Sequence, residues 1–347
     1  MNEQADHLPR VPTPRSDGST KRAFRLACSV VPPLVLVSLL VGSGWFWILD
    51  LLISGYWLLW FVSVAVLLAL CIPRRRLVPV LSLLVVIGCI WPTIASRSLW
   101  IPADIGAAGT GDVSVLVFNS DMGNKARGRV LPFVLDQHTD VAVILEPVWD
   151  FYASVTKFHE VDGLYPSWLE RTTEQGNARI LVLSRWPMTR FEEEPLANID
   201  GLVCRVHRPA EAGGEFVVIA THPHSPRDPQ RWAYGNESLR RIADRINQLV
   251  AEGYRVVLGA DLNAPPGSIR DRILRRSAGA VRSKPLLGRW GTFPASWSVG
   301  RIAIDDLWCP PGTRVRSWRT VHGPGSDHRA VRAVISLTDT TIEPADR

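Results

Sequence analysis

The sequence predicts an α/β domain with two layers of sheet, preceded by three membrane-spanning helices. Two observations support this architecture. The chain is almost continuously apolar from about residue 26 to residue 94, and from Asp112 onward short apolar runs alternate with amphipathic segments. A bilayer core is crossed by about 20 apolar residues, and alternating strand and helix signals over about 225 residues are typical of one α/β unit.

The apolar region divides into three stretches of the length of a membrane span. They lie at residues 26–45, 52–72 and 77–94, and no charged residue interrupts any of them. The breaks contain Asp50 and the run Arg74, Arg75 and Arg76. A cleaved signal peptide is the alternative for the first stretch, and a buried helical hairpin is the alternative for a membrane anchor. The further apolar stretches favour the anchor.

The basic residues predict the orientation of the anchor. Arginine and lysine precede the first stretch and separate the second from the third, and positively charged loops stay in the cytoplasm. Residues after about 96 are therefore expected outside it. The predicted organisation is a disordered cytoplasmic tail at 1–25, an anchor at 26–95, a linker at 96–111, the α/β domain at 112–338 and a tail at 339–347, in a multi-pass protein of the cell membrane.

The charge of the α/β domain indicates little attraction for nucleic acid. Residues 1–100 hold nine Lys and Arg against four Asp and Glu, which leaves 30 against 29 in residues 101–347. The basic character of the chain is thus mainly a signal of topology, because phosphate-backbone binding usually needs an excess of cations. Cys204 and Cys309 lie in the domain expected outside the cytoplasm, where a disulfide is permitted; the sequence leaves their pairing open.

Polar residues follow each of several expected strands. Strands are expected at 114–118, 140–145, 179–183, 202–206, 215–220, 255–258, 301–304 and 330–335, and helices at 130–137 and 231–251. The residues at the strand ends are Asn119, Glu146, His222, Asp261 with Asn263, Asp305, and Asp327 with His328. Each run alone is explained by a polar turn. Together, acid, amide and imidazole groups at one rim suit the binding of a divalent cation and a water against a phosphate ester.

This order of residues resembles the endonuclease/exonuclease/phosphatase superfamily, which includes DNase I-like nucleases, inositol phosphatases and sphingomyelinases. The resemblance rests on Leu145-Glu146, Gly259-Ala260-Asp261-Leu262-Asn263, Ile304-Asp305 and Ser326-Asp327-His328, with support from Ser184-Arg185-Trp186-Pro187. It implies a DNase I-like fold, a two-layer β-sandwich flanked by helices. One departure is Asp306, which stands where many members have His and is expected to add negative charge near the site.

The resemblance also implies a role for each strand-end residue. Glu146 is expected to be the principal ligand of Mg²⁺, with Mn²⁺ as an alternative ion; Asn119 would support the metal or the phosphate, and Asp327 would complete the metal site. Asp261 would orient or deprotonate the attacking water, and Asn263 would bond a phosphate oxygen.

The remaining roles concern the phosphate and the leaving group. His328, held by Asp305, would contact phosphate oxygens or pass a proton. His222 would protonate the leaving oxygen or stabilise charge in the transition state. Arg185 is expected either to contact phosphate or to be a solvated arginine.

The substrate is less specified than the reaction. A short linker would hold the site near the bilayer, and a membrane-anchored, outward-facing member resembles the VanJ-type proteins linked with teicoplanin resistance. That likeness implies hydrolysis of an undecaprenyl-type lipid phosphate or pyrophosphate, with the bilayer and the lipid-linked substrate as partners. The alternatives are a membrane-tethered extracellular nuclease or phosphodiesterase and a non-catalytic ligand-binding membrane module.

Overall fold

The computed structural model describes residues 47, 48, 50, 111–148, 151, 163–172, 179–191, 200–285, 291–298, 301–310 and 313–337. The predicted spans at 26–45, 52–72 and 77–94 and both predicted tails lie outside the described residues. Within the described ranges, no helix combines the length and the apolar character that crossing a membrane requires.

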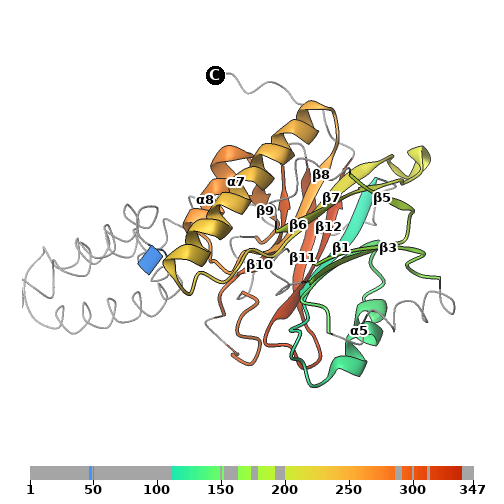
Figure 1. The fold of residues 1–347 in the computed structure, drawn as a ribbon. Helices are drawn as coiled ribbons and strands as arrows, with labels where there is room; N and C mark the ends of the chain where they lie inside the picture. Colours follow the sequence, from blue (N-terminus) through green and yellow to red (C-terminus); the bar gives the residue numbers. More distant parts are fainter. Residues whose placement is uncertain are drawn as a thin grey trace, which may run out of the picture.

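Two six-stranded sheets form the α/β domain (Figure 1). The first has the order β11-β12-β1-β2-β4-β3 and the second β5-β6-β7-β8-β10-β9. Only β1 with β2 and β7 with β8 pair in parallel among the described strands. The strands of the first sheet are β1 (Asp112–Asn119), β2 (Val141–Leu145), β3 (Ser167–Thr172), β4 (Arg179–Ser184), β11 (Arg314–His322) and β12 (Arg329–Ser336). Those of the second are β5 (Met188–Arg190), β6 (Gly201–Val206), β7 (Phe216–Thr221), β8 (Val256–Asp261), β9 (Val281–Arg282) and β10 (Asp305–Cys309).

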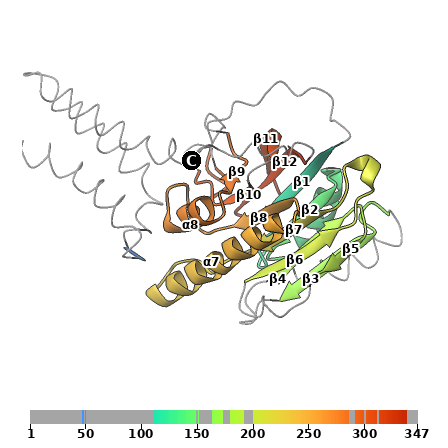
Figure 2. The same ribbon diagram turned by 90° about the horizontal axis from the view of Figure 1, so that it is seen from above.

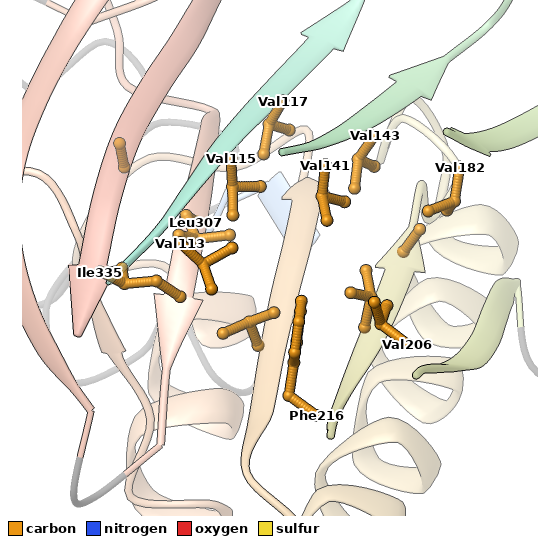
Figure 3. Packing of buried hydrophobic residues seen from close by; sticks show 14 of the residues in the cluster. Val113, Val115, Val117, Val141, Val143, Val182, Val206, Phe216, Leu307 and Ile335 are labelled. Atoms are coloured by element: carbon orange, nitrogen blue, oxygen red, sulfur yellow. The ribbon is translucent and has the colours of Figure 1, made fainter. Parts of the chain in front are cut away.

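The sheets pack face to face over an apolar core. Figure 3 shows side chains of this core, with Val115, Val143, Phe216 and Leu307 among the labelled residues. Cys204 and Cys309 are buried in the same core as free thiols, so the pairing that the sequence left open is absent from this structure.

Helices cover the outer faces of the two sheets. Alternate strand residues point outward, and on the second sheet they pack against α7 (Pro229–Ala251) and α8 (Ile269–Ser277) (Figure 2). On the first sheet they pack against α5 (Val130–Asp136). Two short 3-10 helices, η1 (Arg127–Arg129) and η3 (Ala210–Ala212), lie in connections.

Most of the strands and helices expected from the sequence are present. Seven of the eight expected strands and both expected helices occur, with bounds shifted by a few residues. The expected strand at 301–304 is wrong: Ile302 forms a single bridge with Phe293, and the strand begins only at Asp305. The backbone of this segment instead bonds two loops, because Ile302 O accepts from Thr292 N and Ile304 O accepts from Leu262 N.

Gly259 allows the two sheets to approach closely next to the rim that carries Asp261. A Cβ atom at Gly259 would lie 3.0 Å from Val143 Cγ2 and 3.1 Å from Val117 Cγ2. Both valines belong to the first sheet, so the absence of a side chain at Gly259 sets the local distance between the sheets.

We therefore expect Gly259→Val to destabilise the domain by about 1–3 kcal/mol, the usual cost of overpacking a core. Thermal or denaturant unfolding of the full chain measures the change. The control is Gly128→Val, where a Cβ meets nothing within 4 Å; its effect should stay within about 0.5 kcal/mol. Equal stability of the two variants would contradict the close approach at Gly259.

Candidate functional site

The sheet topology brings the predicted site residues to one rim. Parallel strands end on the same side, which places Asn119 and Glu146 at the ends of β1 and β2, and His222 and Asp261 at the ends of β7 and β8. An antiparallel neighbour begins where its partner ends. Asp305 at the start of β10 therefore lies directly opposite Asp261 in the register, and His328 immediately precedes β12, which pairs with β1.

A cavity of about 610 Å³ opens at this rim. Its lining is mostly polar, and the neighbouring segments that hold Phe293, Ile302 and Ile304 add apolar side chains. The lining residues are Asn119, Asp121, Glu146, His222, His224, Ser225, Pro226, Arg227, Arg231, Asp261, Asn263, Phe293, Ile302, Ile304, Asp327 and His328. Asp305 does not line the cavity; it is fully buried and accepts a hydrogen bond from His328, which does.

Two of the site residues predicted from the sequence have a backbone φ in the left-handed region. Glu146 has φ 47° and Asn263 has φ 50°. Asn tolerates this region, whereas Glu adopts it at a cost that is usually seen at functional positions. The strain at Glu146 is held by its surroundings, because its N–H donates to Arg179 O at 3.0 Å and its carbonyl accepts from Ser120 Oγ at 2.8 Å.

Glu146 and His222 form a contact between the two sheets. His222 Nε2 lies 3.1 Å from Glu146 Oε1 and 3.9 Å from Asp261 Oδ2. The Asn119 amide nitrogen donates to Asp261 Oδ2 at 3.0 Å and lies 3.4 Å from Glu146 Oε1. Because the Asn119 oxygen accepts from Asp121 N at 3.0 Å, this side chain orients two carboxylates in the present geometry.

His328 lies between two buried carboxylates. Its Nδ1 donates to Asp305 Oδ2 at 2.9 Å and lies 3.7 Å from Asp261 Oδ2. Burial alone would lower the pKa of His328, but the charges of Asp305 and Asp261 raise this pKa to about 10. The imidazole is therefore a cation at neutral pH, and its other nitrogen lies 3.7 Å from Asp327 Oδ1.

This environment shifts the pKa values of Asp305 and Asp261 in opposite directions. Burial raises the pKa of Asp305, and the neighbouring Asp261 charge adds to that rise. Burial also acts to raise the pKa of Asp261, but His328, His222 and the N–H of Asn263 outweigh it and bring the pKa below its ordinary value. Asp261 is thus the more acidic of the two carboxylates, and its Oδ1 accepts from Asn263 N at 2.7 Å.

The donor set fits a hard divalent cation near Glu146. The Glu146 side chain is 29% exposed and that of Asp327 60% exposed, so both offer carboxylate oxygens to the cavity, which Mg²⁺ prefers while it keeps several waters. Ligand atoms of Asp261, Asp305 and His328 also lie within 4.8 Å of one another. That buried group suits an ion less well, because a protonated imidazole has no lone pair to donate.

Arg185, expected as a possible phosphate contact, is not part of this site. It follows β4, whose last residue Ser184 pairs with Val141 at the start of β2, so it lies at the opposite end of the sheet from Glu146. Its guanidinium pairs with Asp140 Oδ1 at 3.2 Å. The alternative reading, a partly solvated arginine, holds.

Asp306 does not add charge to the cavity, contrary to the expectation from the sequence. Successive residues of a strand point to opposite faces, and Asp306 is turned away from Asp305. It accepts from Ser283 Oγ at 2.6 Å and from Trp318 Nε1 at 3.2 Å, and it lies 3.8 Å from Arg282 Nη1. Asp306 therefore belongs to a buried polar network that excludes it from the site.

Several lining residues were not predicted. Asp121, Ser225, Arg227, Arg231 and Phe293 lie in loops or at the start of α7, where no strand end marks them. The only signal was proximity in sequence to Asn119 and His222. Phe293 could not be found this way, because it reaches His328 from a separate loop, with ring centroids 5.0 Å apart.

The sequence of the chain matches the model of one known protein family. Residues 116–328 match the model of the Endonuclease/Exonuclease/phosphatase family. No curated protein matches the chain. Similar solved structures include an endonuclease/exonuclease/phosphatase from Bacteroides vulgatus, at 17% identity over 65% of this chain and 99% of that one, with a TM-score of 0.49. The human Nocturnin catalytic domain has 14% identity over 65% and 94%, with a TM-score of 0.49. A mannosyl-6-phosphatase from Bacteroides thetaiotaomicron has 13% identity over 64% and 99%, with a TM-score of 0.47.

The raised pKa of His328 predicts how stability changes with pH. Between its ordinary pKa near 6.5 and about 10, the folded chain holds a proton that the unfolded chain has lost, so stability should fall as pH rises through this range. The slope approaches about 1.4 kcal/mol per pH unit for one proton. Thermal unfolding from pH 6 to pH 10 measures it.

His328→Asn should be less stable at neutral pH and should lose much of this slope. His207→Asn is the control, because His207 pairs with Glu215 at a distance from the rim; its slope should match that of the wild type. A wild-type slope retained in His328→Asn would show that another group carries the proton.

Proposed function

Because the chain belongs to the endonuclease/exonuclease/phosphatase family, whose members are phosphoric ester hydrolases, we propose that it is a membrane-anchored phosphoesterase. It uses Mg²⁺ or Mn²⁺ and hydrolyses a lipid-linked phosphate or pyrophosphate on the outer side of the cytoplasmic membrane. The observation that carries this proposal is the cavity itself, whose lining combines carboxylates and imidazoles with a group of apolar side chains.

The polar residues of the cavity support hydrolysis by an activated water. Asp261 is ionised and fixed by Asn119 and Asn263 N, so it can orient the water and accept its proton. The water oxygen bonds to phosphorus as the bond to the leaving oxygen breaks. His222 then supplies a proton to that oxygen, so that an alcohol or a lipid phosphate and an orthophosphate result.

The charges around the phosphate would be balanced by two kinds of group. A divalent ion held by Glu146, with Asp327 nearby, would supply Lewis-acid stabilisation of a phosphate oxygen. The imidazolium of His328, fixed by Asp305 at 2.9 Å, and the amide of Asn263 would stabilise the remaining oxygens. All these groups are held in place before the substrate arrives, which is the main source of electrostatic catalysis.

The apolar part of the lining supports a lipid substrate. Phe293 and Ile302, which form a β-bridge, line the cavity together with Ile304. Trp297, four residues after Phe293, is 57% exposed and is one of two large apolar side chains exposed to this extent in the described part of the chain. Aromatic side chains of this kind are frequent at membrane–water interfaces.

The rim supports recognition of a second phosphate. Arg227 and Arg231 line the cavity beside His224, and Arg231 is kept near the rim by Asp228, which caps α7 and lies 3.3 Å from its Nε. A pyrophosphate bound at Glu146 and His328 would extend toward these cations. This arrangement favours a pyrophosphate over a monophosphate.

A membrane-tethered nuclease is the second candidate function. The two rim arginines are its support, since nucleic-acid phosphates bind cations. Four carboxylates, Asp121, Glu146, Asp261 and Asp327, line the same cavity, and the α/β domain is nearly neutral. A non-catalytic module is less well supported, because every predicted site residue except Arg185 lies in or directly behind one cavity.

The test is a substrate comparison with the purified full chain in detergent and Mg²⁺. We expect release of phosphate from polyprenyl pyrophosphate and much slower reaction with phospholipid or with single- or double-stranded DNA. Chelation of the ion should abolish the activity. Asp261→Ala and Glu146→Ala should each reduce the rate about 100-fold or more, as expected when a preorganised group is lost from an active site.

Two further variants sharpen this experiment. Arg227→Gln should weaken hydrolysis of pyrophosphate more than that of a monophosphate. Arg185→Gln is its matched control, since Arg185 lies at the opposite end of the first sheet, and it should behave as the wild type. Cleavage of DNA without release of phosphate from the lipid would contradict the proposal and favour the nuclease.

A further inference from the structure

Asp50 is bonded to the catalytic domain although it precedes β1 by more than 60 residues in the sequence. It is helical, as are Trp47 and Ile48, and only 4% exposed. Figure 1 shows this short blue segment beside α7 and α8, and Figure 2 shows it on the same side. Its carboxylate accepts from Trp232 Nε1 at 2.9 Å and from Ile269 N at 2.8 Å.

Both donors require an acceptor of this kind. Ile269 is the first residue of α8, and its N–H has no partner within the helix. The helix cap, Ser268, accepts from Asp271 N instead. A carboxylate at this end of a helix is also favoured by the aligned peptide dipoles. Trp232 lies in the first turn of α7, so Asp50 joins the beginnings of two helices.

The second residue of α8 connects this contact to the site. Arg270 is fully buried. Its guanidinium donates to Leu262 O at 2.6 Å and to His224 O at 2.7 Å, and its Nε lies 3.3 Å from Asn236 Oδ1. Leu262 stands between Asp261 and Asn263, and His224 lines the cavity. Arg270 thus ties together the two loops that carry His222 and Asp261.

A buried arginine of this kind depends on counter-charges. Burial lowers the pKa of Arg270 to about 10, and the charges of Asp50, Asp261 and Asp200 act against this, with Asp50 the strongest of the three. Space for the guanidinium comes from α7, where a Cβ at Gly235 would lie 2.5 Å from Arg270 Nη2. Asp50 therefore supplies part of the negative charge that favours the buried guanidinium.

We propose that Asp50 is a positioning residue: it docks the segment before the catalytic domain onto the first turns of α7 and α8 and supports Arg270 in holding the two catalytic loops. The docking surface is formed by Trp232 and Ile269, and its occupant is Asp50 of the same chain. Trp232, which bonds Asp50, directly follows Arg231 in the sequence, and Arg231 lines the cavity. Asp50 is in this way coupled to the site, whatever substrate the site accepts.

Hydrogen exchange of the full chain in detergent tests this coupling without reference to activity. Asp50→Ala should speed exchange of the Ile269 amide and of amides in the loops at 222–224 and 261–263 by about tenfold or more, the effect of losing a hydrogen bond to a charged group. Glu237→Ala is the matched control, because Glu237 is an exposed acid on α7 that pairs with Arg240 and Arg241. It should leave these amides unchanged.

Two further variants separate docking from general destabilisation. Trp232→Phe removes one donor and keeps an aromatic ring, so its effect on exchange should not add to that of Asp50→Ala, since both break the same bond. Asp50→Glu should restore part of the protection. Wild-type exchange at Ile269 and both loops in Asp50→Ala, or additive effects of Asp50→Ala and Trp232→Phe, would overturn the proposal. Absence of hydrolysis with every substrate would leave these results unaffected.

Discussion

The structure of the site depends on one ion cluster, the pair of buried carboxylates that share His328. The antiparallel register of β8 and β10 places Asp261 directly opposite Asp305, and two negative charges cannot both be buried there without a cation. His328 supplies it from the first sheet, and Ser326 Oγ, which donates to Asn119 O at 2.8 Å, fixes the turn that presents it. The cluster therefore joins the two sheets at the rim.

A second contact between the sheets lies beside the first. Glu146 extends from the first sheet and His222 from the second, and they meet at 3.1 Å. Asn119 lies between the two contacts, because its amide faces both Asp261 and Glu146. The packing of the two sheets thus sets the positions of four groups that line the cavity, His222, His328, Glu146 and Asp261. This rigidity is what electrostatic catalysis of phosphate hydrolysis requires.

The sequence allowed the ends of most strands to be predicted, but it did not allow the directions of the side chains there to be predicted. Asn119, Glu146, His222 and Asp261 were predictable because apolar runs stop directly before them, and parallel strands end at one rim. Asp306 was misplaced because the strand expected at 301–304 ended before Asp305, which left both acids in one polar turn. Both residues lie in β10, where neighbouring side chains point to opposite faces. Arg185 follows a strand just as Glu146 does, but an antiparallel strand ends at the other rim.

Contacts between distant segments were beyond prediction from a single sequence. In the sequence, Asp50 marks a break between two apolar stretches. Nothing near it in the chain indicates a contact with Trp232 or Ile269, which are 182 and 219 residues away. The sequence also indicated no role for Arg270, which is fully buried. Both positions are explained by charge: a buried guanidinium needs carboxylates, and a carboxylate at the start of α8 meets that need.

The central claim is that His328 neutralises the buried carboxylates and leaves Glu146 to bind the ion. Anomalous scattering from a crystal of the full chain grown with Mn²⁺ locates the ion directly. We expect one ion in the cavity, coordinated by a carboxylate oxygen of Glu146 and separated from the nitrogen atoms of His328. An ion bound among Asp261, Asp305 and His328 would contradict the account, because it would require a neutral imidazole in place of the ion pair.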